Sequence, residues 1–499
     1  MSLREWWGGR SRAQRLSVVA VAAVVAAGVW GGVKIGGTVS HSNHTCSNQG
    51  ATIVLKDGPD GECVGLSDGY YDFEPSLHRV DQLILTENQW VVGQHKPYVS
   101  VVYLLPMPSG DAGTLSVHTV EEQLDGAYTE QHYANRDDVG SAGTLPLIRI
   151  LIGNGGNLWD GESGTLRDIE AGVSSQRIVA LAGLGVSLAS TVSTVQQLTG
   201  DGLPVVGASA TADNLDNIPG LVRITPSNSD EAKVVLAYVK ATAASAALIE
   251  DDNPADSYAQ ALSRDFTADY PAAGIVDKEI YDTRDSADVV QNRINQMPAD
   301  LCIAHPGVVM FAGRSAQLTE LLQALASRPC SRQDITIVTG GDATNVTLDS
   351  TVKTTLGSGV AVYYAGIAHP DEWGAGTGAP CAYKYQGYAT FCQAYTQFPA
   401  GSLADGNTMM GYDATLTAVT AIRLAGTQPS PQGVETDLGA LQRAHVVYGA
   451  SGPIVLSADY AGGRGSDPQN KPVPLLQLEP NGDPRLIRLT WPEGQPSSF

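Results

Sequence analysis

The 499-residue chain is short of basic side chains: 30 lysines and arginines stand against 52 aspartates and glutamates, a formal net charge of -22. A surface of that sign repels phosphate backbones, which argues against nucleic acid as a partner. Histidines are sparse, and the sequence lacks a Gly-x-Ser-x-Gly elbow, a His-Glu-x-x-His pair, a P-loop and a spaced set of metal ligands. We therefore expect no enzyme activity, no cofactor and no metal site.

Long uncharged runs are also scarce, and the one near the N-terminus extends from Leu16 to Val33. It is about long enough to span a bilayer with slight tilt, and it is longer than a usual signal-peptide core. Four arginines precede it and mostly acidic sequence follows, so the positive-inside rule places the N-terminus in the cytoplasm. We expect a single-pass protein of the cell membrane whose bulk is extracellular; the alternative is secretion after signal cleavage.

Cysteines number only six. An even count in an exported chain predicts disulfide bonds. Other connectivities are compatible with the sequence, but pairing of nearest neighbours would join Cys46 to Cys63, Cys302 to Cys330, and Cys381 to Cys392.

From Tyr98 onward, strand-like segments alternate with helix-like segments in two consecutive series. The expected helices span residues 117–135, 165–173 and 187–198 in the first series, and 230–244, 257–270, 287–297 and 316–326 in the second. A strand is expected within "DLCIAHPGVVMFAG", which begins at Asp300. Two such series imply two parallel sheets with helices on both faces, whose ligands bind beyond the carboxyl ends of the strands.

The stretch "AGLGVSLAS" approaches the Gly-x-Gly-x-x-Gly fingerprint of dinucleotide-binding proteins. No acidic residue follows the next strand-like segment, "LPVVGAS", where the ribose of a dinucleotide would need one. This absence argues against a nucleotide. The turn still predicts an anion site, because Ser187 is placed to cap a helix whose first amides would face a carboxylate. The alternative is that Ser187 only caps its own helix.

The order of motifs resembles the type I periplasmic binding proteins, in particular the leucine/isoleucine/valine-binding receptors of ABC importers. The motifs concerned are "AGLGVSLASTVSTVQQLTGDGLPVVGASATADNL", "GYDATLTAVTAIRLAG", "YGASGPIVLSADYAGG" and "PLLQLEPNG". The resemblance extends from about Tyr98 to about Asp483. It implies an α/β fold of two doubly wound parallel-sheet lobes joined by a three-crossover hinge, here preceded by one N-terminal transmembrane helix.

The resemblance also implies a division of the chain. The expected parts are a cytoplasmic N-terminus (1–15), a transmembrane anchor (16–35), an extracellular extension (36–95), lobe 1 (96–223 and 365–449) and lobe 2 (224–364 and 450–499).

By this resemblance, one lobe would hold the carboxylate of a ligand. Ser187 and the run Ser209, Ala210 and Thr211 match the residues that do so in these receptors.

The other lobe would close over the ligand. Tyr258 matches the aromatic residue of that lobe, and Asp342 matches the acid that meets the ligand's ammonium group. Tyr258 could instead be a core residue, and Asp342 an ordinary turn aspartate. Arg314 stands near a position where the amino-acid receptors commonly have an aromatic residue, and a guanidinium there would favour an acidic ligand.

The function implied is that of a membrane-anchored extracellular receptor that closes on a small amino acid or related carboxylate and serves an ABC permease. One alternative is a ligand-sensing or protein-interacting ectodomain without transport. A hydrolase or a nucleotide-dependent enzyme is the less favoured alternative, with His305 and His369 as its candidate cleft residues.

Overall fold

The structure is a computed structural model. It describes residues 46, 55–58, 62–107, 115–136, 144–157, 159, 162–240, 243–374, 380–398, 401–456 and 467–495. The predicted transmembrane anchor, residues 16–35, lies outside these ranges. Within them, no helix combines the length and the apolar character that crossing a membrane requires.

Lobe 1 is built on a seven-stranded sheet with the order β1-β2-β4-β3-β5-β6-β7. Its strands are β1 (Leu55–Asp57), β2 (Cys63–Ser67), β3 (Tyr98–Leu105), β4 (Leu147–Asn154), β5 (Ile178–Gly183), β6 (Val205–Gly207) and β7 (Leu221–Arg223). From β4 to β7 the pairing is parallel. The central strands are buried along almost their whole length, as expected of parallel strands covered on both faces.

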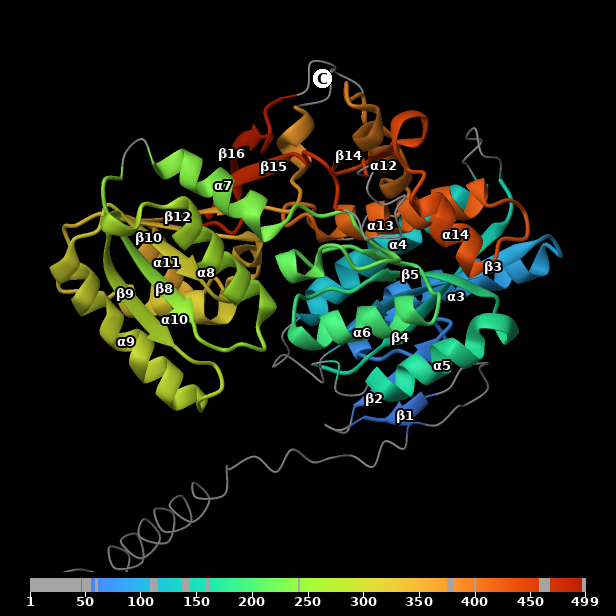
Figure 1. Ribbon diagram of the computed structural model, residues 1–499, viewed down its shortest axis with the longest axis horizontal. Coiled ribbons are helices and arrows are strands. Elements are labelled where there is room, and N and C mark those ends of the chain that lie inside the picture. Colours follow the sequence, from blue (N-terminus) through green and yellow to red (C-terminus); the bar gives the residue numbers. More distant parts are fainter. Residues whose placement is uncertain are drawn as a thin grey trace, which may run out of the picture. The chain divides into compact units, whose positions relative to one another are not determined.

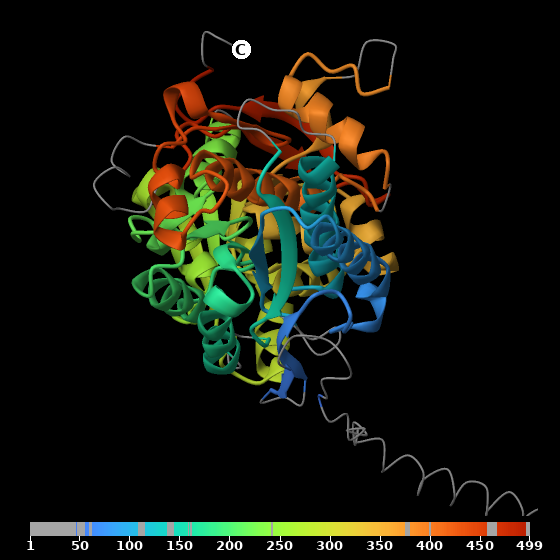
Figure 2. The same cartoon turned by 90° about the vertical axis from the view of Figure 1, so that its right-hand side faces the viewer.

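Helices cover both faces of this sheet, and Figure 2 shows α3 on the opposite side from α5 and α6. The helices of lobe 1 are α3 (His78–Gly93), α4 (Val117–Arg136), α5 (Glu162–Ser175), α6 (Ala189–Gly200), α12 (Gln386–Tyr395), α13 (Asn407–Leu424) and α14 (Pro431–Leu438). The predicted helices of the first series are therefore present, with shifted ends.

Residues 55–93, predicted to form an extension outside lobe 1, are part of its structure. Strands β1 and β2 extend the sheet, with β2 antiparallel to β4. Helix α3 packs on α4 and β4 and buries Val80, Ile84 and Val91. The prediction was wrong because short antiparallel edge strands carry too little periodic signal to reveal which sheet they join.

Lobe 2 also has a seven-stranded sheet, with the order β16-β15-β12-β11-β10-β8-β9. Its strands are β8 (Ala246–Asp251), β9 (Ile275–Tyr281), β10 (Val308–Ala312), β11 (Ile335–Thr339), β12 (Val360–Ala365), β15 (Val473–Gln477) and β16 (Arg485–Thr490). Strands β15 and β16 are antiparallel. The prediction of two parallel sheets is thus confirmed for the centre of each sheet, while one edge of each is antiparallel.

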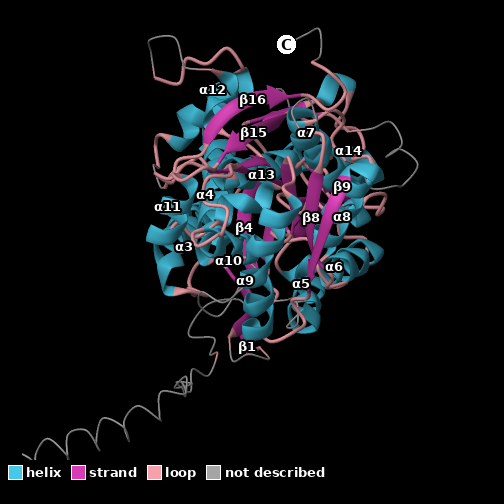
Figure 3. Cartoon of the chain, turned by 90° about the vertical axis from the view of Figure 1, so that its left-hand side faces the viewer, coloured by secondary structure: helices cyan, strands magenta, loops and turns pink. Residues whose placement is uncertain are grey.

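Two apolar cores lie on the two faces of the lobe 2 sheet. Helices pack over both faces, and Figure 3 shows them around strands β8 and β9. The helices are α7 (Asn228–Val239), α8 (Ser257–Asp269), α9 (Ala287–Ala304), α10 (Ser315–Leu325) and α11 (Ser350–Leu356). Helices α7 and α8 bury residues in one core, and α9 and α10 in the other.

Helix α9 runs past the end predicted for it. The sequence predicts an end at Met297 and a strand beginning at Asp300, whereas α9 continues through Pro298 to Ala304. Ile294, Met297 and Leu301 are all buried in one core, so the apolar face of the helix continues across the proline. The strand β10 begins only at Val308.

The chain passes between the lobes after β7, after β12 and before β15 (Figure 1). The first and third of these segments are tied together by an ion pair. Arg223, at the end of β7 and fully buried, places its Nε 2.6 Å from Oδ1 of Asp467, which precedes β15.

Two of the expected disulfides are confirmed: Cys302–Cys330 and Cys381–Cys392. Cys46 and Cys63 are each disulfide-bonded as well, and no cysteine in the described ranges is free.

Asp81 gives lobe 1 a pH dependence that can be measured. Its side chain in α3 is fully buried, neither oxygen accepts a hydrogen bond from the described residues, and burial raises its pKa to about 9, with Asp72 as the next cause. The folded state therefore retains a proton that the unfolded chain loses near pH 4, and wild-type stability falls between about pH 4 and about 9. Asp81→Asn removes this dependence.

We expect Asp81→Asn to gain stability over the wild type as pH rises from 5 to 9, by up to about 1.4 kcal/mol per pH unit. Thermal and urea unfolding at pH 5, 7 and 9 measure the difference. Asp201→Asn, at an exposed position, is the control. If the stabilities of the wild type and Asp81→Asn changed with pH in parallel, Asp81 would not be the source of the pH dependence.

Candidate functional site

A pocket between the two lobes brings together residues that follow eight strands. It has a volume of about 50 Å³ and lies at the carboxyl ends of the strands, where doubly wound sheets bind their ligands. Six of the seven predicted site residues line it: Ser187, Ser209, Thr211, Tyr258, Arg314 and Asp342. The seventh, Ala210, does not; it is fully buried, and its carbonyl accepts a hydrogen bond from Arg223.

The glycine turn after β5 is explained by packing. Gly183 has a φ of +111°, and a Cβ there would lie 2.5 Å from the carbonyl oxygen of Leu104. Gly185 has a φ of +41°, and a Cβ there would lie 2.7 Å from Leu115. Both positions therefore require glycine because β3 and its following segment pass so close to the turn.

Ser187 is not the helix cap that its position predicts. Helix α6 begins at Ala189 after Leu188, whose amide donates to the hydroxyl of Thr191 at 3.2 Å. The hydroxyl of Ser187 instead accepts a hydrogen bond from the amide of Ala212 at 3.0 Å. That bond orients Ser187 Oγ at the pocket and leaves its proton available for donation.

The two other hydroxyls on the lobe 1 side differ in availability. Ser209 donates to the carbonyl of Gly185 at 2.9 Å and accepts from Gln123 at 3.0 Å, so its hydrogen-bonding groups are occupied. The hydroxyl of Thr211 makes no hydrogen bond within the described ranges. Ser187 and Thr211 are therefore the two hydroxyls that can donate to a ligand carboxylate.

The lobe 2 side presents the carboxylate of Asp342. Its Oδ2 accepts from the amide of Ser315 at 2.6 Å, and its Oδ1 accepts from Asn345 at 3.2 Å. The hydroxyl of Tyr258 accepts a 3.3 Å hydrogen bond from the amide of Asp342. These contacts hold Asp342 in place while each oxygen keeps a lone pair free for a cation.

Arg314 lines the pocket, but its charge is neutralised within lobe 2. Its Nε and Nη2 lie 2.7 and 2.8 Å from the two carboxylate oxygens of Asp256, and its guanidinium lies over the Tyr258 ring, 4.6 Å from the centroid. Nη2 also donates to the carbonyl of Ser187 at 2.9 Å. The bidentate pair removes the reason for expecting an acidic ligand.

Glu231, which was missed in the sequence, also lines the pocket. It lies in the first turn of α7 and is fully buried; Oε2 accepts from the amide of Gly341 at 3.3 Å, and Oε1 has no hydrogen-bond partner among the described residues. Burial raises its pKa well above the ordinary value. Acids are common in a first helical turn, so its sequence position alone gave no sign of this role.

Direct contacts join the lobes around the pocket. The carbonyl of Ser187 accepts from the amide of Tyr258 at 3.3 Å, and the amide of Ala189 donates to the carbonyl of Ala255 at 3.0 Å. On the other wall, Thr119 in α4 donates to Asn345 at 3.3 Å. The structure is therefore in a conformation with the lobes in contact.

The histidines considered for an enzyme do not line the pocket. His305 ends helix α9 with a φ of 52°, and buried His369 caps a 3-10 turn through Nδ1, which accepts from the amide of Asp371. Both histidines cap local backbone structure, His305 at the end of α9 and His369 at the start of the 3-10 turn.

Two mixed seven-stranded lobes, three crossovers and a polar pocket between the lobes define the type I periplasmic binding protein fold. No protein-family model matches the chain, and no curated protein matches it.

Solved structures are similar to the chain in fold. The substrate-binding protein LivJ of a branched-chain amino acid transporter from Streptococcus pneumoniae, in complex with isoleucine, has a TM-score of 0.57 at 15% identity, covering 79% of this chain and 99% of LivJ. The leucine-binding protein LivK from Thermotoga maritima has a TM-score of 0.56 at 14% identity, covering 79% and 99%. A solute-binding protein from R. palustris, in complex with 4-hydroxybenzoate, has a TM-score of 0.56 at 13% identity, covering 79% and 97%. The two-lobed α/β fold implied by the sequence resemblance is thus confirmed, while the predicted N-terminal transmembrane helix lies outside the described residues.

Proposed function

We propose that the protein is an extracellular solute-binding receptor that closes on a small amino acid or a related carboxylate. The observation that carries this proposal is the polarity of the pocket. Lobe 1 offers two donor hydroxyls, Ser187 and Thr211, and lobe 2 offers the carboxylate of Asp342 with the buried acid Glu231 beside it. A molecule with a carboxylate at one end and an ammonium at the other complements both sides.

Closure follows from this division of contacts. A ligand held by lobe 1 gains the contacts of lobe 2 only when the lobes meet, so its binding favours the closed state. A volume of about 50 Å³ is small for a ligand pocket. A ligand with a small side chain therefore suits this conformation best. A larger side chain would have to displace Arg314 toward an adjoining pocket of about 370 Å³, which Arg314 and Asp342 also line.

We also propose where the receptor is located and which kind of protein it serves. Residues 16–35 would anchor the chain in the cell membrane, and the extracellular part would deliver its ligand to an ABC permease. The uncharged run after four arginines supports the anchor, and the similarity in fold to transporter substrate-binding proteins supports the permease.

A thermal-shift screen of the purified full-length protein tests the ligand class. We expect glycine, alanine or another small amino acid to raise the melting temperature, because a ligand at 100 times its Kd adds about 2.7 kcal/mol to the stability of the folded state. Propionate, which lacks the ammonium group, should stabilise less than alanine. Stabilisation by ATP or NAD alone, or by no solute in the panel, would contradict the proposal.

A further inference from the structure

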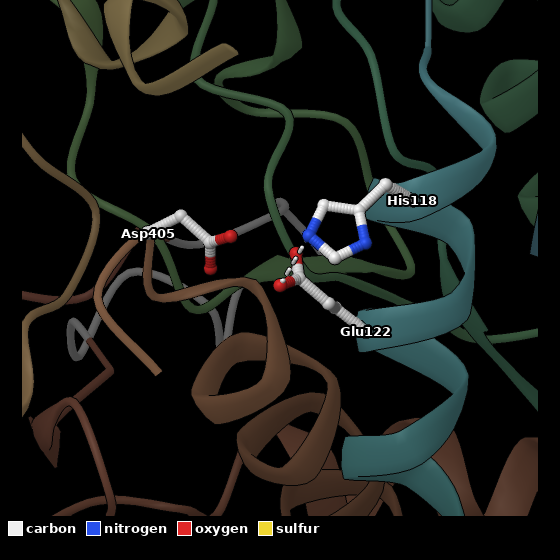
Figure 4. Close-up of side chains that lie close together, drawn as sticks. All are labelled: His118, Glu122 and Asp405. Carbon is white, nitrogen blue, oxygen red and sulfur yellow. Dashed lines mark ion pairs between the residues drawn. The ribbon is translucent and has the colours of Figure 1, made fainter. Parts of the chain in front are cut away.

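A second polar cluster lies in lobe 1, formed by His118, Glu122 and Asp405 (Figure 4). His118 and Glu122 are one turn apart on the same face of α4, and Asp405 belongs to the loop before α13. An imidazole nitrogen and two carboxylate oxygens, one ligand atom from each residue, all lie within 4.8 Å of one another. His118 Nε2 is 3.1 Å from Glu122 Oε1.

The burial of Glu122 is an independent sign that this cluster holds a cation. Its side chain is only 2% exposed, and its Oε1 forms an ion pair with His118 Nε2 at 3.1 Å. Its carboxylate points toward the other two side chains (Figure 4). A buried carboxylate requires a positive charge beside it; a metal ion in place of the imidazole proton would supply that charge and bind the carboxylate and the imidazole nitrogen together.

Asp405 brings a second carboxylate to the same place. Its Oδ1 accepts from the amide of Asn407 at 2.9 Å, which fixes the side chain beside Glu122. Two adjacent carboxylates disfavour each other's charge unless a cation lies between them.

We propose that His118, Glu122 and Asp405 bind a divalent transition-metal ion, with Zn²⁺ as the representative probe. One imidazole and two carboxylates suit zinc and its neighbours better than magnesium or calcium, which prefer oxygen ligands alone. Tetrahedral zinc holds its ligand atoms about 3.4 Å apart, so small side-chain rotations complete the site. The side chain of His118 is 67% exposed, which gives the ion a path from solvent and leaves one position for water.

The bound ion would join α4 to the start of α13. Asn407, the first residue of α13, donates to Glu122 Oε2 at 3.4 Å and lines the ligand pocket on its other side. The metal site is thus separate from the pocket but shares a wall with it.

Calorimetric titration of the chelator-treated full-length protein with ZnCl₂ tests the site. We expect one ion per chain, and binding weakened on the order of a hundredfold by His118→Ala and by Asp405→Asn. The matched control is His78→Ala: His78 pairs with one carboxylate, Asp72, at 2.6 Å and should not affect zinc binding. Because His118 is exposed, its replacement should preserve the fold.

Three results would overturn the proposal. These are a wild-type protein that binds no stoichiometric zinc, zinc binding that both variants retain in full, and calcium or magnesium binding tighter than that of zinc. A visible spectrum of the Co²⁺-loaded wild type that lacks the bands of a tetrahedral site would exclude the proposed geometry.

Discussion

Asp342→Asn is expected to weaken binding of an amino-acid ligand by about 10- to 100-fold. The substitution keeps the size of the side chain but removes the negative charge that lobe 2 directs into the pocket. Arg314 pairs with Asp256 and also lies 4.0 Å from Asp342 Oδ1, so the three side chains together carry one negative charge, which Asp342→Asn removes. A hydrogen bond to a charged group contributes about 1.5–3 kcal/mol, which corresponds to the expected loss.

Calorimetry with the amino acid that most stabilises the wild type measures this effect. Asp252→Asn is the matched control, because it removes the same charge from an exposed position of the same lobe. Asp342→Asn should also lose the preference for alanine over propionate. An unchanged affinity would show that Asp342 does not meet the ammonium group, and Glu231→Gln would then be the variant to measure.

Asp413→Ala is expected to lower the free energy of unfolding by about 3–5 kcal/mol. Asp413 lies in α13 with no exposed surface, and its carboxylate accepts from the amides of Ala450 and Ser451 and from the Ser451 hydroxyl. Fully buried Lys471 donates to the same hydroxyl at 2.8 Å. Removing Asp413 would leave two buried amides without their acceptor and the buried Lys471 ammonium without the negative charge of Asp413.

Urea unfolding of the wild type and variants measures this loss. Asp252→Ala, at an exposed position, should change stability by less than about 0.5 kcal/mol. The double variant Asp413→Ala with Lys471→Met should be more stable than Asp413→Ala alone, since it removes the unpaired charge. If Asp413→Ala behaved like the exposed control, the buried cluster would not be a major source of stability.

The sequence predicted more of the pocket's location than of its chemistry. Ser187, Thr211 and Asp342 follow strands, and parallel strands end on the same edge of a sheet, so their convergence could be expected. The partner of Arg314 could not be predicted, because Asp256 lies 58 residues away and reads as an ordinary helix cap. Without that partner, the guanidinium appeared to be a ligand-binding group.

Other differences between prediction and structure also arise from contacts between segments that are far apart in the chain. Glu231 and Asp405 are ordinary acids in the sequence, and only the packing of other segments buries Glu231 beside the pocket and places half-buried Asp405 beside Glu122. A metal site was not expected because two of its ligands lie on one helix and the third nearly 300 residues further along the chain. Helix α9 passes Pro298 because a continuous apolar face is buried beneath it.

The sequence by itself determined the two alternating series, the two lobes, that the cysteines form disulfides and the edge at which a ligand would bind. These features follow from apolar periodicity, turn residues and cysteine spacing, which act over a few neighbouring residues or follow simple rules of chain order. Tertiary structure alone decided which hydroxyls are free to donate, that Arg314 pairs with Asp256, that Glu231 and Glu122 are buried, and that His118 and Asp405 lie beside Glu122. The state of a polar group depends on its burial and its partners, and those partners come from segments far apart in the chain.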